Sequence, residues 1–322
     1  MTLSPQTARL LDMVYSVGAP RFHELSVAQA RQSFRKLLHV FRPDAPAVSS
    51  VMDVPVSRGD GSVLLCRLYR PLRCARDQRL PCLVYLHGGG WCVGDVESYD
   101  VLCRELANLS GCAVFSVDYR LAPEHPFPAA IPDVRIACDW LRCNAPGLAL
   151  DAARFAVGGD SAGGNLALVH ALAMRELGGD MPRHLFLVYP CTEMLSERPS
   201  RRVFGEGYLL DGGSLDWFFE RYLQGASPTD WRASPMCAHS LAGLPPMSLV
   251  TAGYDPLTDD CHAFADRVVA EGGAVARLQV PGVVHGFITL GKLLPEAHDA
   301  MRWLGEAVGE ALGAGTDAQD AA

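Results

Sequence analysis

The sequence predicts an α/β protein with a mostly parallel sheet of eight strands and helices on both faces. From residue 81 onward, short apolar runs alternate with helical patterns, which indicates parallel strands joined by crossover helices. The runs are almost continuously apolar, as expected for strands that are buried on both faces. With 322 residues, 49% of them hydrophobic, the chain can bury such a sheet within one large domain.

The eight strands are predicted, in order, near residues 51–57, 62–70, 82–87, 112–118, 154–158, 184–190, 247–253 and 275–281. The first two form a hairpin, because Asp60-Gly61 between them favours a tight turn. Two segments lie outside the alternation. Residues 1–48 carry helical patterns, with Ser4 as an N-cap and Pro5 in the first turn. Residues 192–235 contain an apolar, aromatic patch.

Composition argues against several classes of function. The net charge of −8 and the isoelectric point near 5.7 disfavour a nucleic-acid partner, which clustered Lys and Arg would bind. No apolar run reaches membrane-spanning length, and the N-terminus lacks the basic start and apolar stretch of a signal peptide. Eleven cysteines without a paired zinc-binding spacing indicate buried thiols in a reducing compartment. We expect a cytoplasmic protein with no cofactor and no metal, and the sequence leaves a homodimer open.

One predicted strand-to-helix turn carries a candidate nucleophile. Gly159-Asp160-Ser161-Ala162-Gly163 follows an apolar run and begins a helical pattern. A serine on such a turn holds its hydroxyl out at the edge of the sheet, and the glycines avoid a clash across the bend. The N–H of Ala162 would then point to the place where an oxyanion forms. We interpret Ser161 as a nucleophile; the alternative is a Gly-rich connection with an incidental serine.

A second motif, His87-Gly88-Gly89-Gly90-Trp91, directly follows a predicted strand. Three consecutive glycines are costly in conformational entropy, so a folded protein needs a reason to keep them. Their bare, closely approachable N–H groups suit the stabilisation of a developing negative charge. A flexible surface loop is disfavoured by the strand before it and the bulky Trp91 after it. A phosphate loop would end in Lys followed by Ser or Thr, which is absent here.

A nucleophilic serine needs a base and a group that orients the base. Of the ten histidines, His285 lies in a glycine-relieved loop just past a predicted strand. Asp255 lies at the end of another predicted strand, so both side chains emerge where strands end. The order Ser161, Asp255, His285 is the order expected of the α/β-hydrolase fold. We call these three residues the predicted triad.

The motifs together resemble the hormone-sensitive-lipase-like branch of the α/β-hydrolases, also called bacterial family IV esterases. The matching segments, in the order of the family, are His87-Gly88-Gly89-Gly90-Trp91, residues 119–130, Gly159-Asp160-Ser161-Ala162-Gly163-Gly164-Asn165, Asp255-Pro256-Leu257 and His285-Gly286-Phe287. The resemblance spans roughly residues 50 to 310. It implies that the predicted triad is catalytic and that the N–H groups of Gly89, Gly90 and Ala162 form the oxyanion hole.

The resemblance also implies a domain organisation. Residues 1–48 and 192–235 resemble the helical cap that covers the active site in this family, although an ordinary packing insertion is the alternative for such segments. The catalytic core would then comprise residues 49–191 and 236–312. The small, polar residues 313–322 are expected to be a disordered tail.

The cap would contribute to an apolar substrate pocket. Trp91, Trp217 and Phe218 are the candidate walls, although an aromatic stripe at helical spacing is more often packing than pocket. A closed apolar pocket binds acyl chains more strongly as their length increases, until the pocket is full, and then excludes longer chains.

These observations predict a serine carboxylesterase that hydrolyses short- to medium-chain acyl esters of small molecules through an acyl-enzyme intermediate. An amidase, thioesterase or acyltransferase could use the same predicted triad. A non-catalytic small-molecule receptor on this fold is disfavoured, because such receptors lack the histidine that is present here as His285.

Overall fold

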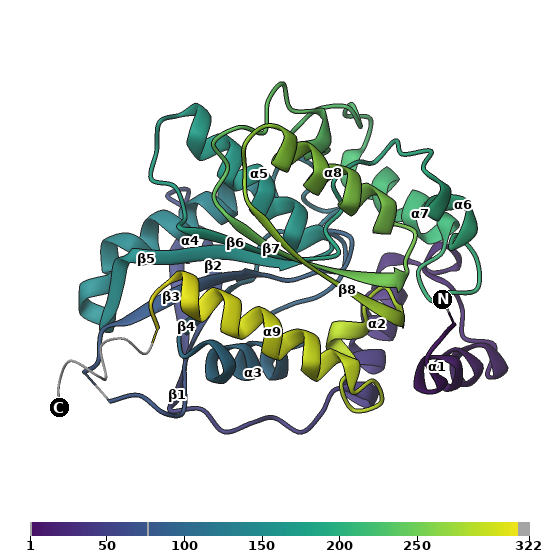
Figure 1. The fold of residues 1–322 in the computed structure, drawn as a ribbon, viewed down its shortest axis with the longest axis horizontal. Coiled ribbons are helices and arrows are strands. Elements are labelled where there is room, and N and C mark those ends of the chain that lie inside the picture. Colours follow the sequence, from purple (N-terminus) through teal and green to yellow (C-terminus); the bar gives the residue numbers. More distant parts are fainter. Residues whose placement is uncertain (1, 76, 315–322) are drawn as a thin grey trace.

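The computed structural model describes residues 2–75 and 77–314 and contains one sheet of eight strands (Figure 1). The strands are β1 (Ser50–Ser57), β2 (Val63–Arg70), β3 (Leu80–Leu86), β4 (Ala113–Val117), β5 (Leu150–Asp160), β6 (His184–Val188), β7 (Met247–Tyr254) and β8 (Val275–Val284). Their spatial order is β1-β2-β4-β3-β5-β6-β7-β8. All eight predicted strands are therefore present, and the prediction of an α/β fold is confirmed.

The sheet is antiparallel at one edge and parallel elsewhere. β1 pairs with β2 as the predicted hairpin, and β2 pairs antiparallel with β4. The remaining six strands are mutually parallel, because a helix or a long connection separates each from the next. The central strands β3, β4 and β6 are buried at every residue, which agrees with their continuously apolar sequences.

Helices cover both faces of the sheet, as predicted (Figure 1). On one face α3 (Asp100–Ser110) and α9 (Glu296–Ala311) pack on the sheet and on each other. On the other face lie α4 (Ala130–Asn144), α5 (Ala162–Glu176) and α8 (Thr258–Ala270). Two large clusters of buried apolar side chains correspond to these two faces. Helix α5 is buried on nearly all sides, whereas the others expose a polar face.

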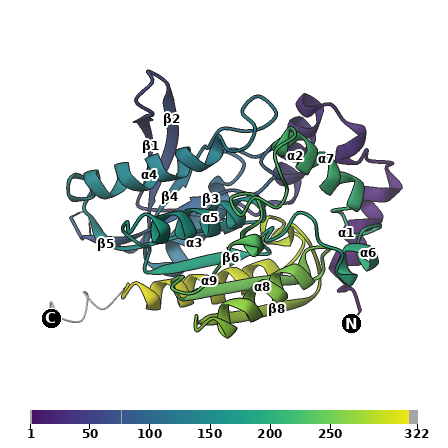
Figure 2. The same cartoon turned by 90° about the horizontal axis from the view of Figure 1, so that it is seen from above.

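The two segments that fall outside the alternation lie together at one end of the molecule (Figures 1 and 2). The first contains α1 (Pro5–Ser16), η1 (Phe22–Glu24) and α2 (Val27–Phe41). The second contains α6 (Pro199–Val203) and α7 (Gly212–Leu223). Ser4 caps α1 by accepting a hydrogen bond from the Thr7 N–H, as the sequence predicts.

Three short 3₁₀ helices complete the described chain: η2 (Ala145–Leu148), η3 (Pro235–Cys237) and η4 (Phe287–Thr289). The expected disordered tail is only partly described. Gly313 and Ala314 continue α9 through turn hydrogen bonds to Glu310 and Gly309, and the rest of that expectation lies outside the described residues. None of the helices in the described ranges has both the length and the apolar character that a membrane span requires.

Helix α5 begins in close contact with the end of β3. A Cβ atom at Gly159 would lie 1.9 Å from the carbonyl oxygen of Leu86, and one at Gly163 would lie 1.8 Å from the same oxygen. No rotamer change can relieve such a clash, because both atoms belong to the main chain or are attached to it. The requirement for glycine on both sides of Ser161, which the sequence predicts, has this steric origin.

We expect Gly163→Ala to lower the free energy of unfolding by roughly 3 kcal/mol or more, because the backbone of β3 must shift to admit the methyl group. Urea unfolding followed by circular dichroism measures the change. Gly147→Ala is the matched control, since a Cβ at Gly147 meets no atom within 4 Å. Equal stability of the two variants would contradict the steric explanation.

Candidate active site

Ser161 lies on the turn between β5 and α5 in an unusual backbone conformation. Its φ is 53° and its ψ is −114°, a region that few non-glycine residues adopt. Hydrogen bonds hold the residue there: its N–H donates to the Val188 carbonyl over 2.8 Å, and its carbonyl accepts from the Asn165 N–H over 3.0 Å. The strained turn directs the hydroxyl away from the sheet and toward the next strand ends.

The structure brings the predicted triad together. His285 follows the end of β8, and its Nε2 lies 3.0 Å from Ser161 Oγ. Asp255 follows the end of β7, and its Oδ2 lies 2.7 Å from His285 Nδ1. Asp255 is completely buried, and its other oxygen accepts a hydrogen bond from the Leu257 N–H over 2.8 Å. The carboxylate is thus held in one orientation toward the imidazole.

Two neighbouring carboxylates are engaged elsewhere. Asp259 accepts a hydrogen bond from the Ser200 N–H over 2.8 Å, at the start of α6. Asp260 forms ion pairs with Arg198 and Arg201 over 3.0 and 2.9 Å. Both residues lie in the first turn of α8, as expected for acidic side chains at a helix N-terminus. Asp255 is the acid that His285 contacts.

The glycine loop after β3 lies beside Ser161. Gly89 and Gly90 have φ values of 110° and 56°, which favour glycine, and the Gly89 carbonyl accepts hydrogen bonds from the N–H groups of Cys92 and Val93. Among the described residues, none accepts a hydrogen bond from the N–H groups of Gly89 and Gly90. These donors are therefore free to bind an oxygen atom in the cavity. Ala162, the first residue of α5, supplies a helix N-terminus at the same place.

The buried carboxylate of Asp160 supports the glycine loop from below. It accepts hydrogen bonds from the Gly88 N–H over 2.8 Å, from the Tyr85 hydroxyl over 2.7 Å and from the Tyr99 hydroxyl over 3.0 Å. Burial raises the pKa of Asp160, and the three donors oppose that rise. A Cβ at Gly88 would lie 2.2 Å from this carboxylate, so the loop is fixed close to it. The sequence motif contains Asp160 but does not indicate this supporting role.

His87 is also part of this support. Its ring stacks on Tyr119 with centroids 4.3 Å apart, and the Tyr119 hydroxyl donates to the His87 carbonyl over 2.7 Å. Its Nδ1 lies 2.8 Å from the Gly88 carbonyl oxygen. The imidazole is completely buried under the loop. It therefore packs beneath the loop, and it is His285 that contacts the hydroxyl of Ser161.

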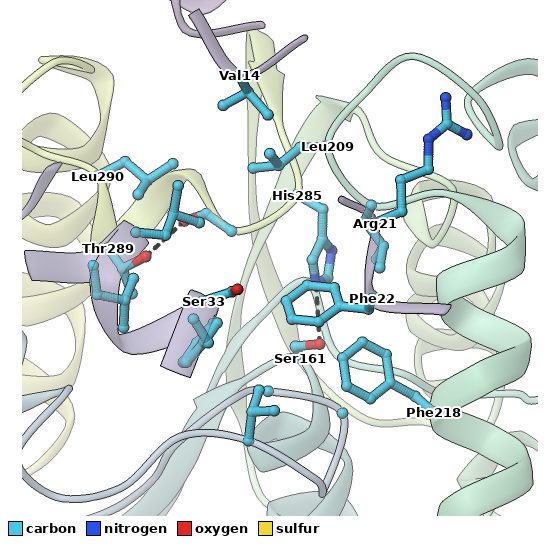
Figure 3. A pocket seen from close by; sticks show the side chains of 18 of the residues that line it. Val14, Arg21, Phe22, Ser33, Ser161, Leu209, Phe218, His285, Thr289 and Leu290 are labelled. Carbon is cyan, nitrogen blue, oxygen red and sulfur yellow. Dashed lines mark hydrogen bonds between the residues drawn. The ribbon is translucent and has the colours of Figure 1, made fainter. Parts of the chain in front are cut away.

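A cavity of about 620 Å³ opens above Ser161 and His285 (Figure 3). Its walls come from α1, η1, α2 and α7, together with the glycine loop and the segment after β8. Phe22 of η1 and Phe218 of α7 lie close to the Ser161 hydroxyl, with their rings 5.1 Å apart (Figure 3). No group of three His, Cys, Asp or Glu side chains that could hold a metal ion occurs among the described residues.

Two of the three expected pocket residues line this cavity. Trp91 and Phe218 belong to its walls, whereas Trp217 is not among the described residues that do. Consecutive positions on a helix point about 100° apart, so Trp217 faces a different direction from Phe218. It packs instead against the guanidinium group of Arg221, 3.9 Å from the ring centroid. The expectation of Trp217 as a pocket wall is therefore wrong, and its ring packs against neighbouring side chains instead.

Several residues of the cavity wall, above all Phe22 and Phe34, could not be predicted from the sequence patterns. Both lie in the first 48 residues, where the pattern predicts helices but no contact with Ser161. Phe22 lies in a single turn of 3₁₀ helix between α1 and α2, and its ring contacts α7, which lies far away in the sequence. Such a contact has no local sequence signal.

Comparison with known proteins agrees with this geometry. The family model for the α/β-hydrolase fold matches residues 83–289, more than half of the chain. An ethyl acetate hydrolase from Pseudomonas putida is 36% identical over 320 residues, which cover 97% of this chain and all of the relative. This chain belongs to the α/β-hydrolases. Within them it is a member of the hormone-sensitive-lipase-like branch, as its motifs indicate.

Solved α/β-hydrolase structures resemble it over almost their whole length. An ester hydrolase from the metagenome of Lake Arreo, in complex with a derivative of bipyridine phosphonate, has a TM-score of 0.93 and 41% identity, covering 97% of this chain and all of that one. A hyperthermophilic esterase from the archaeon Pyrobaculum calidifontis has a TM-score of 0.86 and 35% identity, covering 96% and 99%. The helical segments around the cavity are therefore included in the match.

We expect Asp160→Ala to lower the free energy of unfolding by about 3 to 5 kcal/mol, because three buried donors lose their acceptor. Asp160→Asn should cost less, because its amide oxygen can still accept and the shape is preserved. Urea unfolding measures both. The exposed Asp12 on α1 provides the control, since Asp12→Ala should change stability by less than about 0.5 kcal/mol. An Asp160→Ala variant as stable as the control would contradict the role of Asp160 as a support.

Proposed function

We propose that this protein is a serine carboxylesterase that hydrolyses short- to medium-chain acyl esters of small molecules. The observation that carries the proposal is the continuous contact from Asp255 through His285 to Ser161, with distances of 2.7 and 3.0 Å, at the floor of an apolar cavity. The relatives named as ester hydrolases and esterases support the choice of the ester bond.

In the first half of the reaction, Ser161 Oγ attacks the ester carbonyl while its proton passes to His285 Nε2. Asp255 accepts the Nδ1–H, which selects the tautomer with a free Nε2 and stabilises the imidazolium that forms. His285 then gives its proton to the leaving alcohol. The acyl group remains on the serine as an ester.

The negative charge of the tetrahedral intermediate develops on the carbonyl oxygen. The N–H groups of Gly89, Gly90 and Ala162 act as its donors, in a site from which the cavity walls exclude much of the water. In the second half, His285 removes a proton from a water molecule, which attacks the acyl-enzyme. The acid leaves and Ser161 recovers its proton from His285.

The helical segments 1–48 and 192–235 act as a cap in this proposal. They supply Phe22 and Phe218, two rings that lie close to the reacting hydroxyl (Figure 3). Gly90 lies directly against the second ring, because a Cβ at Gly90 would lie 2.3 Å from Phe218 Cδ1. Residues of the cap and of the glycine loop together enclose the place where the acyl group of the substrate would lie. A cavity of about 620 Å³ suits a small organic ester, since small-molecule sites commonly occupy roughly 300 to 1,000 Å³.

The triad is tested with p-nitrophenyl butyrate. We expect Ser161→Ala to fold normally and to lose activity by several orders of magnitude. Asp255→Asn should lower kcat by roughly 10⁴, chiefly because the amide favours the wrong histidine tautomer. Steady-state kinetics provide both values, and circular dichroism verifies folding.

Asp259→Asn is the matched control for the choice of acid, because Asp259 is the neighbouring carboxylate bound to Ser200. It should keep kcat within about threefold of the wild type. If Asp255→Asn kept a normal kcat while Asp259→Asn lost activity, the acid of the triad would be Asp259 and not Asp255. A matching anilide and thioester, assayed alongside, separate an esterase from an amidase or a thioesterase.

Chain-length preference tests the cap. We expect kcat/KM to rise from acetyl toward butyryl or hexanoyl, at about 0.8 kcal/mol for each buried methylene, and to fall for longer chains. Phe22→Ala should move the optimum to longer chains, because it removes a ring beside Ser161. A panel of p-nitrophenyl esters of graded length measures the profile.

Trp217→Ala is the control for this panel. It removes a larger ring from the same part of the cap, but one that does not line the cavity, so stability should fall while the chain-length optimum stays in place. A preference of the wild type for long-chain triglyceride over soluble butyrate would overturn the short-ester assignment. An unchanged optimum in Phe22→Ala would remove Phe22 from the acyl site.

A further inference from the structure

The end of β6 and the segment that follows it form hydrogen bonds to two other parts of the site. The Val188 carbonyl accepts a hydrogen bond from the Ser161 N–H over 2.8 Å, and the Cys191 N–H donates to the Ser161 carbonyl over 3.2 Å. Between these two residues, the Tyr189 N–H donates to the Val250 carbonyl over 2.7 Å. Val250 belongs to β7, the strand that leads to the triad acid. The segment therefore ties the nucleophile turn to the strand of the acid.

The side chain of Tyr189 contacts His285, the base of the predicted triad. Its ring centroid lies 4.4 Å from that of the His285 imidazole, with 46° between the ring planes. A separation this short places the imidazole over the face of the tyrosine ring rather than beside its edge. The tyrosine ring also contacts Phe287 in an edge-on arrangement, with centroids 5.8 Å apart. The aromatic ring of Tyr189 is thus confined against the base.

Tyr189 occupies this place in a strained conformation. Its φ is 36°, in the left-handed region that bulky residues rarely adopt. The side chain is completely buried, and its hydroxyl lies near the backbone N–H of Ile288 without forming a regular hydrogen bond to a described residue. The backbone preference of tyrosine does not explain the residue type. The contact between its ring and His285 is the feature that does.

We propose that Tyr189 is a positioning residue for His285: its aromatic ring holds the imidazole in line with Ser161 and stabilises the imidazolium that forms during the reaction. The inference rests on the proposed esterase function, because it assigns Tyr189 a part in the same proton transfer. Tyr189 does not line the cavity among the described residues, so it acts through His285 and not on the substrate.

The physical basis is the charge distribution of the aromatic ring. The ring face is negative, and a cation within about 6 Å of the centroid is attracted to it. Neutral imidazole gains little from this attraction, whereas imidazolium gains more. The ring therefore stabilises the transition state, in which His285 carries the proton, relative to the ground state.

Other groups around the imidazole act in addition to the ring. Asp255 from the end of β7 and Ser161 from the turn before α5 are hydrogen-bonded to it. Asp160 lines the same cavity and is bonded to the glycine loop. A substitution at residue 189 leaves each of these residues in the protein. A change in kcat or in the imidazole pKa of His285 is therefore attributed to the ring at position 189.

The experiment compares Tyr189→Phe with Tyr189→Leu. Tyr189→Phe removes the hydroxyl, which does not contact the imidazole, and keeps the aromatic ring. We therefore expect kcat to stay within about twofold of the wild type and the pH profile to stay in place. Tyr189→Leu removes the aromatic face, so kcat should fall by about 3- to 30-fold with KM nearly unchanged. The acid limb of kcat/KM should move to lower pH, because a less stable imidazolium gives up its proton at a lower pH.

A shape-conserving series separates electrostatics from packing. Phenylalanine carrying two or five fluorine atoms at position 189 keeps the ring in place while it weakens and then reverses the negative face. We expect kcat to decrease from the unsubstituted to the difluorinated to the pentafluorinated ring. The acid limb of the kcat/KM profile should move to lower pH in the same order. This series also provides the test if Tyr189→Leu fails to fold.

Tyr69→Leu is the matched control, since Tyr69 is equally buried in the same apolar cluster but lies on β2 and outside the cavity wall. It should lower stability and leave kcat per folded molecule unchanged. An NMR titration of His285, assigned with His285→Gln, follows the imidazole pKa without any substrate. That readout distinguishes a failure of the esterase proposal, seen as an inactive wild type, from a failure of the inference.

Three outcomes would overturn the inference. The first is a Tyr189→Phe variant as impaired as Tyr189→Leu, which would assign the effect to the hydroxyl. The second is an imidazole pKa that stays constant through the fluorinated series. The third is a loss of activity in Tyr189→Leu that only matches its loss of folded protein, as in Tyr69→Leu.

Discussion

The close approach of α5 to the Leu86 carbonyl oxygen is the constraint on which the rest of the site depends. Leu86 ends β3 and is followed by the glycine loop, while α5 begins directly after Ser161. Because Gly159 and Gly163 admit no side chain against that oxygen, the helix starts at the end of the neighbouring strand. Ser161 and the glycine loop with Gly89 and Gly90, which are more than 70 residues apart in the sequence, are thereby placed at one edge of the sheet.

Backbone strain is concentrated around the same place. Among the described non-glycine residues with positive φ, Trp91, Ser161 and Leu209 line the cavity and Tyr189 packs on His285. Strained conformations persist only where their surroundings hold them, and here the surroundings are rigid. Trp91 stacks on Tyr222 with centroids 4.3 Å apart. The other strained positions near the base are held by hydrogen bonds to adjacent strands. The sheet thus holds Ser161 and Tyr189 in conformations that these residues rarely adopt.

The walls of the cavity are joined by contacts of a different kind. Arg21 and His23, on either side of Phe22, lie 3.6 and 3.3 Å from the buried carboxylate of Asp211 at the start of α7. Phe22 itself lies between Phe34 and the α7 rings. The two segments that we propose as a cap therefore meet through one carboxylate and a set of aromatic rings. Their joint surface, rather than either segment alone, forms the roof above Ser161.

The sequence by itself determined the sheet, the glycine-flanked turn at Ser161 and the three residues of the predicted triad, which the structure brings into contact. Strands buried on both faces must be continuously apolar, and a sharp turn with close backbone contact admits only glycine, so these features leave a local pattern in the chain. The same is true of Ser161, Asp255 and His285, because each follows the end of a recognisable strand. The sequence pattern was sufficient to predict a feature wherever neighbouring residues in the chain cause that feature.

Only the tertiary structure decided which side chains surround the triad. Whether Trp217 or Phe218 faces the cavity depends on the rotation of α7 against η1, which neighbouring residues in the sequence do not set. Phe22 approaches Ser161, and Tyr189 lies over His285, through packing between segments that are distant in the chain. These contacts carry no period or motif, because they arise from the way the strands and helices are packed together.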